Sequence, residues 1–371
     1  MDAERFIAEH IRPIGVSGIR KIFDLAATMT SPIDLSIGQP DFAPPESART
    51  AAIDAIQSGK NGYTPTPGLP ALRERIRQEL QEEFGWEPEV AVHCGVSGGL
   101  TLALLACLNP GDEVVFADPY FVSYTHLVRL AGGVPITVDV YPDFRLHPDR
   151  FANALTPKTK AILLNSPGNP TGVVHAAGDV EAVCALADER DLLVISDEIY
   201  NKLVYDGTSP SPVTYAPDRT LLLRGFGKSY GMTGWRMGYS AGPAAVVQEM
   251  TKLQQYTFVC APQPFQWACV AAMDADVSPH VTDYRRKRDI VSEELDGVFE
   301  FVRPSGGFYV FPRIPSGYAT ATEFVSAAIR REVLIIPGSV FSAHDTHFRI
   351  SYAAPDERLR AGCRILRELA R

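Results

Sequence analysis

The sequence lacks the features that mark several classes of protein. Its six cysteines include no Cys-x-x-Cys pair and its eight histidines form no His-Glu-x-x-His motif, so a disulfide framework and a metal site are both disfavoured. No uncharged stretch approaches the length that crosses a bilayer, and the first residues contain no apolar run of signal-peptide length. These absences predict a cytoplasmic protein that uses no metal and no membrane.

Clustered positive charge is also missing. The formal net charge is −9, whereas contact with nucleic acid requires groups of Lys and Arg. Gly227-Lys228-Ser229 resembles the end of a phosphate-binding P-loop, but that motif needs a glycine five positions before Gly227, where the sequence has Leu222. The composition therefore predicts a small-molecule ligand and no nucleic acid.

The 371 residues suffice for about two domains with a buried core, and 46% apolar with 21% charged residues is ordinary for a globular enzyme. Between about residues 90 and 240, short apolar runs alternate with helical segments near 99–108, 120–131 and 178–190. This alternation predicts a mainly parallel, layered α/β sheet. The predicted strands are Val90–Cys94, Glu113–Phe116, Val134–Val138, Ala161–Asn165, Leu192–Ser196 and Thr220–Leu223.

The pattern changes after about residue 243 to long helices followed by short strands, which predicts a smaller α+β domain. We expect a large domain over residues 41–272 and a small domain formed by residues 1–40 and 273–371. The predicted helices are 47–58, 69–84, 244–255, 263–275, 280–296, 320–331 and one from Asp356, and the predicted strands are Ile33–Ile37, Phe299–Val302, Phe308–Pro312, Val333–Ile336 and His347–Ser351.

Polar residues follow the apolar runs of the predicted sheet, at the strand ends where such sheets bind ligands. Asp197 closes one buried run, where a lone carboxylate is costly unless a cation meets it, and a protonated ring nitrogen would serve. A helix cap or a salt bridge is the alternative for Asp197. Tyr200, three residues later, is expected to point its phenol toward the same region.

Lys228 lies among glycines directly after the run Thr220–Leu223. An amine held at the end of a strand can form a Schiff base, and an exposed lysine beside a turn is the alternative. Asn169 lies in a loop fixed by Pro167 and Pro170, which predicts a placed amide or a plain turn.

Gly98-Gly99-Leu100 is predicted to open a helix, and the free amides of a helix N-terminus bind phosphate. Arg236 can supply the counter-charge through its guanidinium. A lysine, an aspartate, a phenol, a placed amide, a helix N-terminus and an arginine together predict a site for pyridoxal phosphate.

Further motifs occur in a fixed order along nearly the whole chain: Gly38-Gln39-Pro40-Asp41-Phe42, Tyr63, Asp118-Pro119-Tyr120-Phe121, Asn169-Pro170-Thr171-Gly172, Asp197-Glu198-Ile199-Tyr200, Gly227-Lys228 through Trp235-Arg236, Gly306-Gly307-Phe308-Tyr309 and Phe348-Arg349-Ile350. In this order they resemble a class I/II aminotransferase of the fold-type I pyridoxal-phosphate family, close to the aspartate aminotransferase group. The resemblance implies transfer of an amino group between an L-amino acid and a 2-oxo acid.

The resemblance also implies roles for the residues that hold the cofactor ring. Lys228 would form the Schiff base and move the proton, while Asp197 would hold the pyridinium proton. Tyr200 and Asn169 would bind the ring hydroxyl, and Phe121 would stack on the ring.

Other matched positions would hold the phosphate and the substrate. Gly99, Leu100 and Arg236 would bind the phosphate, and Tyr63 would reach the phosphate of a neighbouring subunit, which implies a homodimer. Arg349 would bind the substrate α-carboxylate, with Asn169 beside it and Gly38 closing over it. An ion pair on an edge strand is the alternative for Arg349.

The chain departs from the family at the lysine loop. Relatives commonly carry Ser-Phe-Ser-Lys, and here Gly225 and Gly227 replace both serines. A hydroxyl that would donate to the phosphate is thus absent. We expect a Gly225→Ser variant to be tolerated.

Two other enzymatic functions compete with transamination. A carbon-sulfur lyase that uses pyridoxal phosphate for β-elimination could use the same Schiff base. Gly95-Val96-Ser97-Gly98-Gly99 also matches the nucleophile elbow of serine hydrolases, with His344 and His347 downstream as candidate bases. The elbow leaves Asp197 and Lys228 unexplained.

Overall fold

The computed structural model describes residues 1, 3–12, 14–16, 18, 19, 27 and 29–371. Its centre is a seven-stranded sheet in the order β2-β8-β7-β6-β5-β3-β4, in which only β8 runs antiparallel to its neighbours. The predicted mainly parallel α/β sheet is therefore confirmed. The strands are β2 (Glu89–His93), β3 (Glu113–Asp118), β4 (Val134–Asp139), β5 (Thr159–Asn165), β6 (Leu193–Asp197), β7 (Thr220–Gly225) and β8 (Gly238–Gly242).

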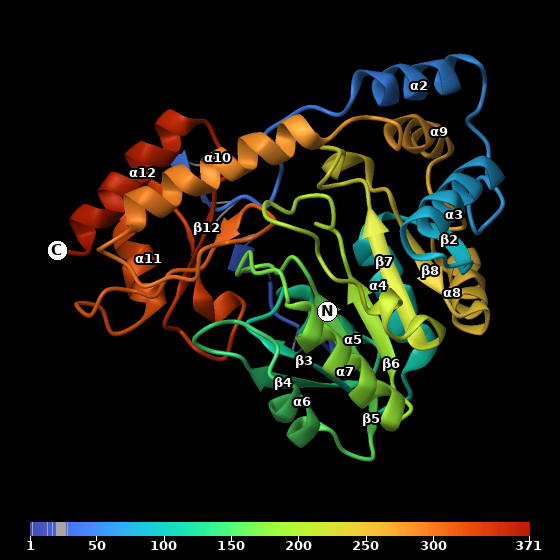
Figure 1. Cartoon of the computed structure of the whole chain (residues 1–371), viewed down its shortest axis with the longest axis horizontal. Helices are drawn as coiled ribbons and strands as arrows, with labels where there is room; N and C mark the ends of the chain where they lie inside the picture. Colours follow the sequence, from blue (N-terminus) through green and yellow to red (C-terminus); the bar gives the residue numbers. More distant parts are fainter. Residues whose placement is uncertain (2, 13, 17, 20–26, 28) are drawn as a thin grey trace.

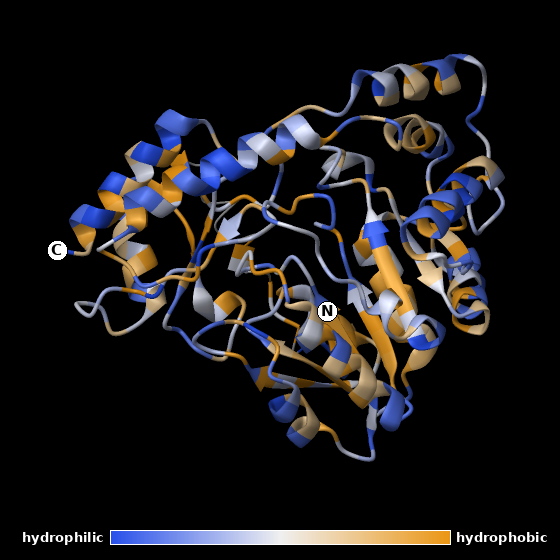
Figure 2. Ribbon diagram, viewed as in Figure 1, coloured by the Kyte–Doolittle hydropathy of each residue, from blue (hydrophilic) through white to orange (hydrophobic). Residues whose placement is uncertain are grey.

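Helices cover both faces of this sheet because successive residues of each strand point to opposite sides. On β5, Ala161 and Leu163 pack toward α4 and α5, whereas Ile162 and Leu164 pack toward α6 and α7. Figure 2 shows the strands as apolar and the outward helix faces as polar. The covering helices are α3 (Pro70–Phe84), α4 (Gly95–Cys107), α5 (Ser123–Leu130), α6 (Pro148–Ala154), α7 (Ala177–Glu189), α8 (Ala244–Thr257) and α9 (Gln263–Ala272). Helix α2 (Glu46–Gln57) packs on α9.

The C-terminal part has its own core beside the sheet, as Figure 1 shows. Three helices, α10 (Ser278–Leu295), α11 (Ala321–Arg330) and α12 (Asp356–Leu369), surround a small antiparallel sheet of β9 (Tyr309–Val310), β12 (Phe348–Ser351) and β11 (Ile336–Pro337). The N-terminal strand β1 (Ile33–Asp34) pairs in parallel with β10 (Val333–Leu334). This pairing supports the two-domain division, which stays a prediction.

One segment connects the two cores. Tyr200, Leu203 and Tyr205 follow strand β6 of the large sheet, yet they are buried in the core that the C-terminal helices form. The end of β6 is therefore held from both sides. Residues that come directly after this strand are placed by packing rather than by a free loop.

Several sequence-based expectations were wrong in detail. No strand forms at Phe299–Val302, and the helix expected over 99–108 begins at Gly95. Strand β8 and helix α6 were not predicted, since Gly238–Gly242 lacks branched residues and α6 has only seven residues. Short 3₁₀ helices occur at Glu4–Phe6, Glu9–Ile11, Pro212–Thr214, Pro217–Arg219, Thr233–Trp235 and Gly338–Val340. None of the helices in the described ranges is long and apolar enough to cross a membrane.

Candidate active site

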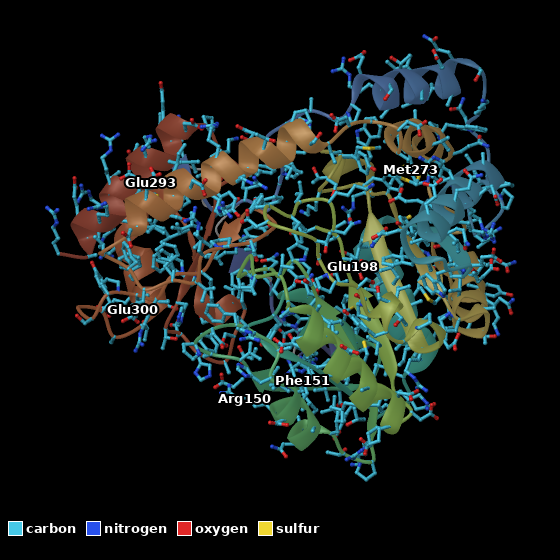
Figure 3. All side chains as sticks on the ribbon, viewed as in Figure 1. Arg150, Phe151, Glu198, Met273, Glu293 and Glu300 are labelled. Carbon is cyan, nitrogen blue, oxygen red and sulfur yellow. The ribbon has the colours of Figure 1, made fainter. Side chains whose placement is uncertain are left out.

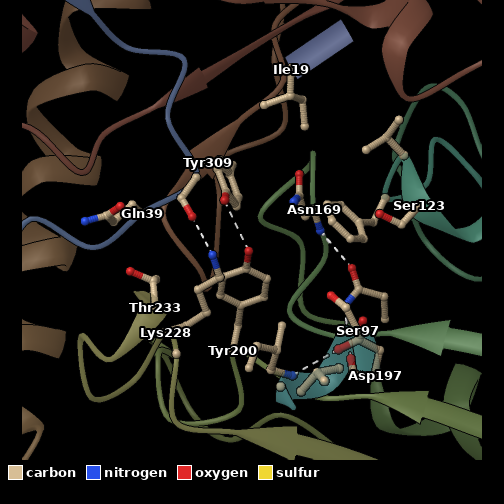
Figure 4. A pocket seen from close by; sticks show the side chains of 18 of the residues that line it. Ile19, Gln39, Ser97, Ser123, Asn169, Asp197, Tyr200, Lys228, Thr233 and Tyr309 are labelled. Atoms are coloured by element: carbon tan, nitrogen blue, oxygen red, sulfur yellow. Dashed lines mark hydrogen bonds between the residues drawn. The ribbon is translucent and has the colours of Figure 1, made fainter. Parts of the chain in front are cut away.

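A cavity of about 450 Å³ lies at the carboxyl ends of the parallel strands. Asn165 ends β5, Asp197 ends β6, and Lys228 lies three residues beyond β7, so three separate strands deliver polar side chains to one place. Eight of the predicted site residues line this cavity, namely Gly38, Phe121, Asn169, Asp197, Tyr200, Lys228, Arg236 and Arg349. Figure 4 shows several of them converging.

Asp197 is a buried carboxylate with no cationic side chain bound to it among the described residues. Its Oδ2 accepts a hydrogen bond from the Tyr124 hydroxyl at 2.7 Å, and its Oδ1 accepts one from the Ile199 amide at 3.2 Å. Burial raises the pKa of Asp197 to about 6, although these donors and the Lys228 charge oppose the shift. The carboxylate therefore has room for a cation and a reason to bind one.

Tyr124 was not predicted as a site residue. It lies on α5, 73 residues from Asp197 in sequence, and it is buried behind the carboxylate. The short motif Asp118-Pro119-Tyr120-Phe121 ends three residues before Tyr124. Its position about one helical turn after this motif was the only sequence signal that could have identified Tyr124. Tyr124 orients the Asp197 carboxylate toward the cavity.

Lys228 is partly buried and directs its amine into the cavity. Its Nζ donates to the Gly38 carbonyl oxygen, as Figure 4 shows. Burial and the positive charges of Arg349 and Arg236 lower the Lys228 pKa to about 8, while Asp197 opposes them. An amine with this pKa is neutral in a sizeable fraction of molecules near physiological pH, which makes it a usable nucleophile and base.

Two phenols stand beside this lysine. The Tyr200 hydroxyl shares a 3.1 Å hydrogen bond with the hydroxyl of Tyr309, which lines the same cavity (Figure 4). Gly38 is required here, because a Cβ at this position would lie 2.5 Å from the Tyr309 hydroxyl oxygen. Tyr309 occurred in a matched motif but was not predicted as a site residue.

Arg349 is fully buried in the cavity wall and forms no ion pair with a described carboxylate. Its Nη1 donates to Asn169 Oδ1 at 3.0 Å and its Nη2 donates to the Ser36 carbonyl at 2.6 Å, which leaves the Nε donor without a partner. The guanidinium carbon lies 4.4 Å from the Tyr309 ring centroid and 4.7 Å from that of Phe341. The expected alternative, an ion pair on an edge strand, does not occur among these residues.

Burial lowers the pKa of Arg349 from its usual range, the direction expected for a guanidinium without an anionic partner. A buried cation of this kind is costly unless an anion joins it. Asn169 accepts a hydrogen bond from Nη1 of Arg349, so the Nε donor of the guanidinium remains available for a ligand. The pair is suited to a carboxylate that enters the cavity.

The helix N-terminus at the cavity is formed by other residues than predicted. Helix α4 begins at Gly95, and Gly95, Val96 and Ser97 line the cavity. Gly99 and Leu100 lie in the second turn and face the sheet, where a Cβ on Gly99 would come within 3.0 Å of His93. The structure thus does not bring Gly99 and Leu100 to the cavity.

Arg236 lies directly against this helix N-terminus. A Cβ on Gly95 would lie 2.8 Å from Arg236 Nη2, so the guanidinium packs on bare glycine backbone. Arg236 pairs with no carboxylate of the described chain, and its φ of 56° is a conformation that non-glycine residues adopt rarely and mostly at functional sites. A helix N-terminus beside an unpaired guanidinium is suited to an anion such as phosphate.

Tyr63 does not reach this cavity within the chain. Its side chain is 83% exposed, in the loop between α2 and α3. That loop is anchored to α8 by Gln254, whose Nε2 donates to the Thr66 carbonyl at 2.7 Å. A role for Tyr63 would therefore require a second subunit.

The hydrolase elbow is not completed by a base. Ser97 lies in the first turn of α4, and no described histidine bonds its hydroxyl. His344 and His347 pack against Tyr141 instead. Within the described ranges, no group of three or more His, Cys, Asp or Glu residues could hold a metal ion.

The side chains fit pyridoxal phosphate on three observations. Lys228 offers an amine of lowered pKa, Asp197 offers a buried carboxylate that no described cationic side chain binds, and Gly95 with Arg236 forms a cradle for an anion. A phosphate, a pyridinium nitrogen and an aldehyde are the groups that these three would meet. The cofactor that was predicted from the sequence thus matches the chemistry of the donor set.

Comparison with known proteins gives a consistent result. The sequence profile described as "Aminotransferase class I and II" matches residues 30–366. A putative aminotransferase of Bacillus subtilis, YugH, is 38% identical, covering 95% of each chain, and the aromatic-amino-acid aminotransferase 2 of Thermococcus litoralis is 35% identical with the same coverage. The structure of Thermus thermophilus aspartate aminotransferase with maleate superposes with a TM-score of 0.95 at 34% identity, covering 98% of this chain and 99% of that one.

Proposed function

Because the chain belongs to the class I and II aminotransferase family, we propose that Lys228 and its neighbours carry out transamination with pyridoxal phosphate in this cavity. The family and its relatives make the chain a pyridoxal-phosphate-dependent aminotransferase that acts on an amino acid and a 2-oxo acid. The observation that carries the residue assignment is a pair of buried groups without an ion-pair partner among the described residues, Asp197 and Arg349, which line the same cavity as the Lys228 amine.

The proposed cofactor contacts follow from the cavity wall. Lys228 Nζ would hold the cofactor covalently as a Schiff base, Asp197 would bind its ring nitrogen and Tyr200 its ring hydroxyl, and the ring of Phe121 would lie against it. The amides of Gly95 to Ser97 and the Arg236 guanidinium would hold the phosphate. When bound, pyridoxal phosphate supplies an electron sink for the pair that remains as the substrate α-proton leaves.

The chain's own residues perform the remaining work. Arg349 and Asn169 bind the substrate α-carboxylate, which fixes the α-carbon near the lysine. Lys228 Nζ, with its pKa of about 8, can remove the substrate α-proton and hold it for return to the carbon on the other side of the amino nitrogen. Asp197, ionised and held by Tyr124, would accept a hydrogen bond from the protonated ring nitrogen of the cofactor and so favour that charged form.

A homodimer is proposed as the working form, in the cytoplasm. Tyr63 is exposed although it is aromatic, and Tyr256, Phe258 and Val259 are also exposed at the end of α8, next to the anchored Tyr63 loop. Exposed apolar side chains that gather in this way are typical of an interface. Tyr63 would then meet the phosphate of the other subunit.

Mixed subunits test this arrangement. A Tyr63→Phe variant should retain the cofactor more weakly than wild type, and its co-expression with a Lys228→Ala chain should restore activity above either variant alone. A monomeric mass in sedimentation experiments, or no restoration in the mixture, would remove the dimer proposal.

Spectroscopy during turnover tests the function. The purified protein should absorb in the region of a bound cofactor aldehyde, and an amino donor should convert that absorbance, with a 2-oxo acid restoring it. Release of ammonia and pyruvate from cysteine conjugates, without return of the spectrum by 2-oxo acids, would favour the β-eliminating lyase instead. A colourless protein that hydrolyses esters would contradict both.

A further inference from the structure

Part of the cavity wall has no role in the contacts described above. Ile19 from the N-terminal segment and Val122 from the start of α5 both line the cavity, and Ile37 lies next to Gly38. Figure 4 shows Ile19 across the cavity from Lys228 and Asp197, directed toward the space between Tyr309 and Asn169. This apolar wall, Ile19 with Val122, faces the site where a substrate would be held.

The apolar wall adjoins the α-carboxylate site directly. Ile19 packs on a cluster that contains Val122 and Phe341, and the Phe341 ring lies 4.7 Å from the Arg349 guanidinium. An amino acid whose carboxylate is bound by Arg349 and whose α-carbon is near Lys228 therefore has apolar surface beside it. The substrate side chain is the part of the molecule that remains to occupy this surface.

Each cationic side chain described in the cavity wall already has a partner in the proposed function. The cations among the described lining residues are Lys228, Arg236 and Arg349, which serve the cofactor aldehyde, the phosphate and the α-carboxylate in turn. A second carboxylate against Ile19 and Val122 would lose its hydration without gaining a further cationic partner among the lining residues that the structure describes. Apolar side chains would instead gain by leaving water.

We propose that this enzyme prefers amino acids with apolar side chains over aspartate, and that Ile19 and Val122 are the residues that determine this preference. The inference rests on the proposed transamination and names its substrate class, which family membership leaves open. Aspartate is the sharpest comparison, because its second carboxylate is one carbon from the α-carbon and cannot pass beyond the wall.

The first test measures single-turnover conversion of the bound cofactor's absorbance in the holoenzyme. Leucine, methionine and phenylalanine should each exceed aspartate in kcat/KM by at least about tenfold, the discrimination that a pocket wall of this kind supplies. Aspartate that reacts as fast as, or faster than, the apolar donors would overturn the inference. Such a result would leave the aminotransferase assignment intact, since amino acids would still convert the cofactor.

A binding measurement decides the inference without turnover. Carboxylates that lack an amino group, 3-phenylpropionate and succinate, can be titrated into the holoenzyme and followed by thermal shift. The first should bind at least about tenfold more tightly. Equal or tighter binding of succinate would overturn the preference even if no amino acid reacted. Because this measurement needs no turnover, it distinguishes failure of the substrate preference from failure of the proposed transamination.

An added cation provides the matched variant. Ile19→Lys should raise kcat/KM for aspartate relative to leucine by at least about tenfold, because it supplies the missing partner on the wall. Leu130→Lys places the same substitution at an exposed position on α5, away from the cavity, and should leave the ratio unchanged. An unchanged ratio in a folded, cofactor-loaded Ile19→Lys protein would remove Ile19 from the assignment.

Discussion

Two buried arginines, Arg224 and Arg349, differ in whether carboxylates of the described chain bind them. Arg224 stabilises the fold, whereas Arg349 lines the cavity. Arg224 on β7 donates through Nε and Nη2 to Glu198 Oε2 at 3.0 and 2.8 Å, and through Nη1 to Glu83 Oε2 at 2.6 Å. These anions raise the pKa of Arg224 against its burial. Figure 3 shows Glu198 deep in the molecule, in contrast to Glu293 and Glu300 at its periphery.

Arg349 is equally buried, but among the described residues its charge meets only an amide oxygen, a backbone carbonyl and two aromatic rings. Both arginines carry the desolvation cost of burial, and of the two only Arg224 has this cost offset by carboxylates in the part of the chain that the structure describes. In this protein, a buried charge without a described partner of opposite sign therefore marks the ligand site. Asp197 follows the same rule on the anionic side, next to the compensated Glu198.

We expect the strongest effect from removing the Lys228 amine, which lines the same cavity as Asp197 and Arg349. Lys228→Ala should lower the turnover rate by at least about a thousandfold, because both the covalent attachment and the proton-moving base are lost. Bound cofactor should remain detectable by absorbance, since Asp197 and Arg236 still hold it. Steady transamination at the wild-type rate would contradict the assignment.

Asp197→Asn comes next, because the neutral amide cannot stabilise a protonated ring nitrogen. We expect the proton-transfer step in a single turnover to slow by about a hundredfold or more while the protein still folds and binds the cofactor. Asn caps about as well as Asp, so a purely structural role predicts almost no change. A rate within about tenfold of wild type, or about 1.4 kcal/mol, would return Asp197 to that role.

The two arginines should respond in opposite ways to the same substitution. Arg349→Gln should lower kcat/KM by about 10- to 100-fold through loss of a charged hydrogen-bonded partner for the substrate, with little change in the free energy of unfolding. Arg224→Gln should lower the free energy of unfolding by about 3–5 kcal/mol, because it leaves Glu198 buried and unpaired. Chemical denaturation and steady-state kinetics on both variants would show whether the effects are separated as expected.

A smaller effect concerns the pH at which Asp197 becomes protonated. Burial raises the pKa of Asp197 from 3.8 to about 6 in the folded protein, so protonation of this side chain stabilises the cofactor-free fold. This contribution to the free energy of unfolding is complete below about pH 3.8 and is lost as the pH rises through about 6. The cofactor needs the ionised form, so its retention should fall as the pH drops below about 6. Tyr124→Phe removes a donor that lowers this pKa and should move the midpoint upward by up to about one pH unit.

Dialysis at a series of pH values, followed by absorbance of the retained cofactor, measures this midpoint. Tyr215→Phe, a half-buried tyrosine beside α7, is the matched control and should leave it in place. A midpoint that moves downward in Tyr124→Phe would contradict the proposed donor role.

The smallest effect distinguishes the two glycines of the lysine loop. The expectation that Gly225→Ser would be tolerated is not supported, because a Cβ there would lie 3.0 Å from the Met237 carbonyl and from Val96 Cγ2. Gly227 has only an ordinary contact at 3.7 Å with Thr233, and it lines the cavity. Gly227→Ser should therefore bind cofactor as well as wild type or better, by about 0.5–1.5 kcal/mol, whereas Gly225→Ser should bind it less well.

Equilibrium titration of the cofactor into both apoproteins would measure the difference. Equal affinities in the two variants would contradict this expectation. They would show that the backbone at Gly225 can shift to admit a side chain despite its close contacts with Met237 and Val96.

The sequence predicted most of what depends on local pattern. Buried apolar runs located all but one strand of the large sheet, and the polar residues that follow them placed Asp197 and Lys228 at one edge. It could not predict Tyr124 or Tyr309, whose partners lie 73 and 109 residues away. Such contacts depend on how distant segments pack together, and the hydrophobic periodicity of a local stretch of sequence does not predict them.

The start of α4 illustrates a different limit. Three glycines in Gly95 to Gly99 disfavour a helix by propensity, so the predicted start came too late. Tertiary packing overrides that preference, since Gly95 admits Arg236 and Gly99 admits His93 at distances that a Cβ would block. Gly99 and Leu100, for which phosphate binding was predicted, therefore lie about one turn beyond the residues of α4 that line the cavity.

Chemical trapping of the cofactor tests the central claim most directly. Sodium borohydride reduction of the purified holoenzyme, followed by proteolysis and mass spectrometry, should place a single pyridoxyl group on the peptide that contains Lys228. The label should be absent from Lys228→Ala. A pyridoxyl group on another lysine, such as Lys202 or Lys287, or no covalent label in a protein that transaminates, would contradict the account of this site.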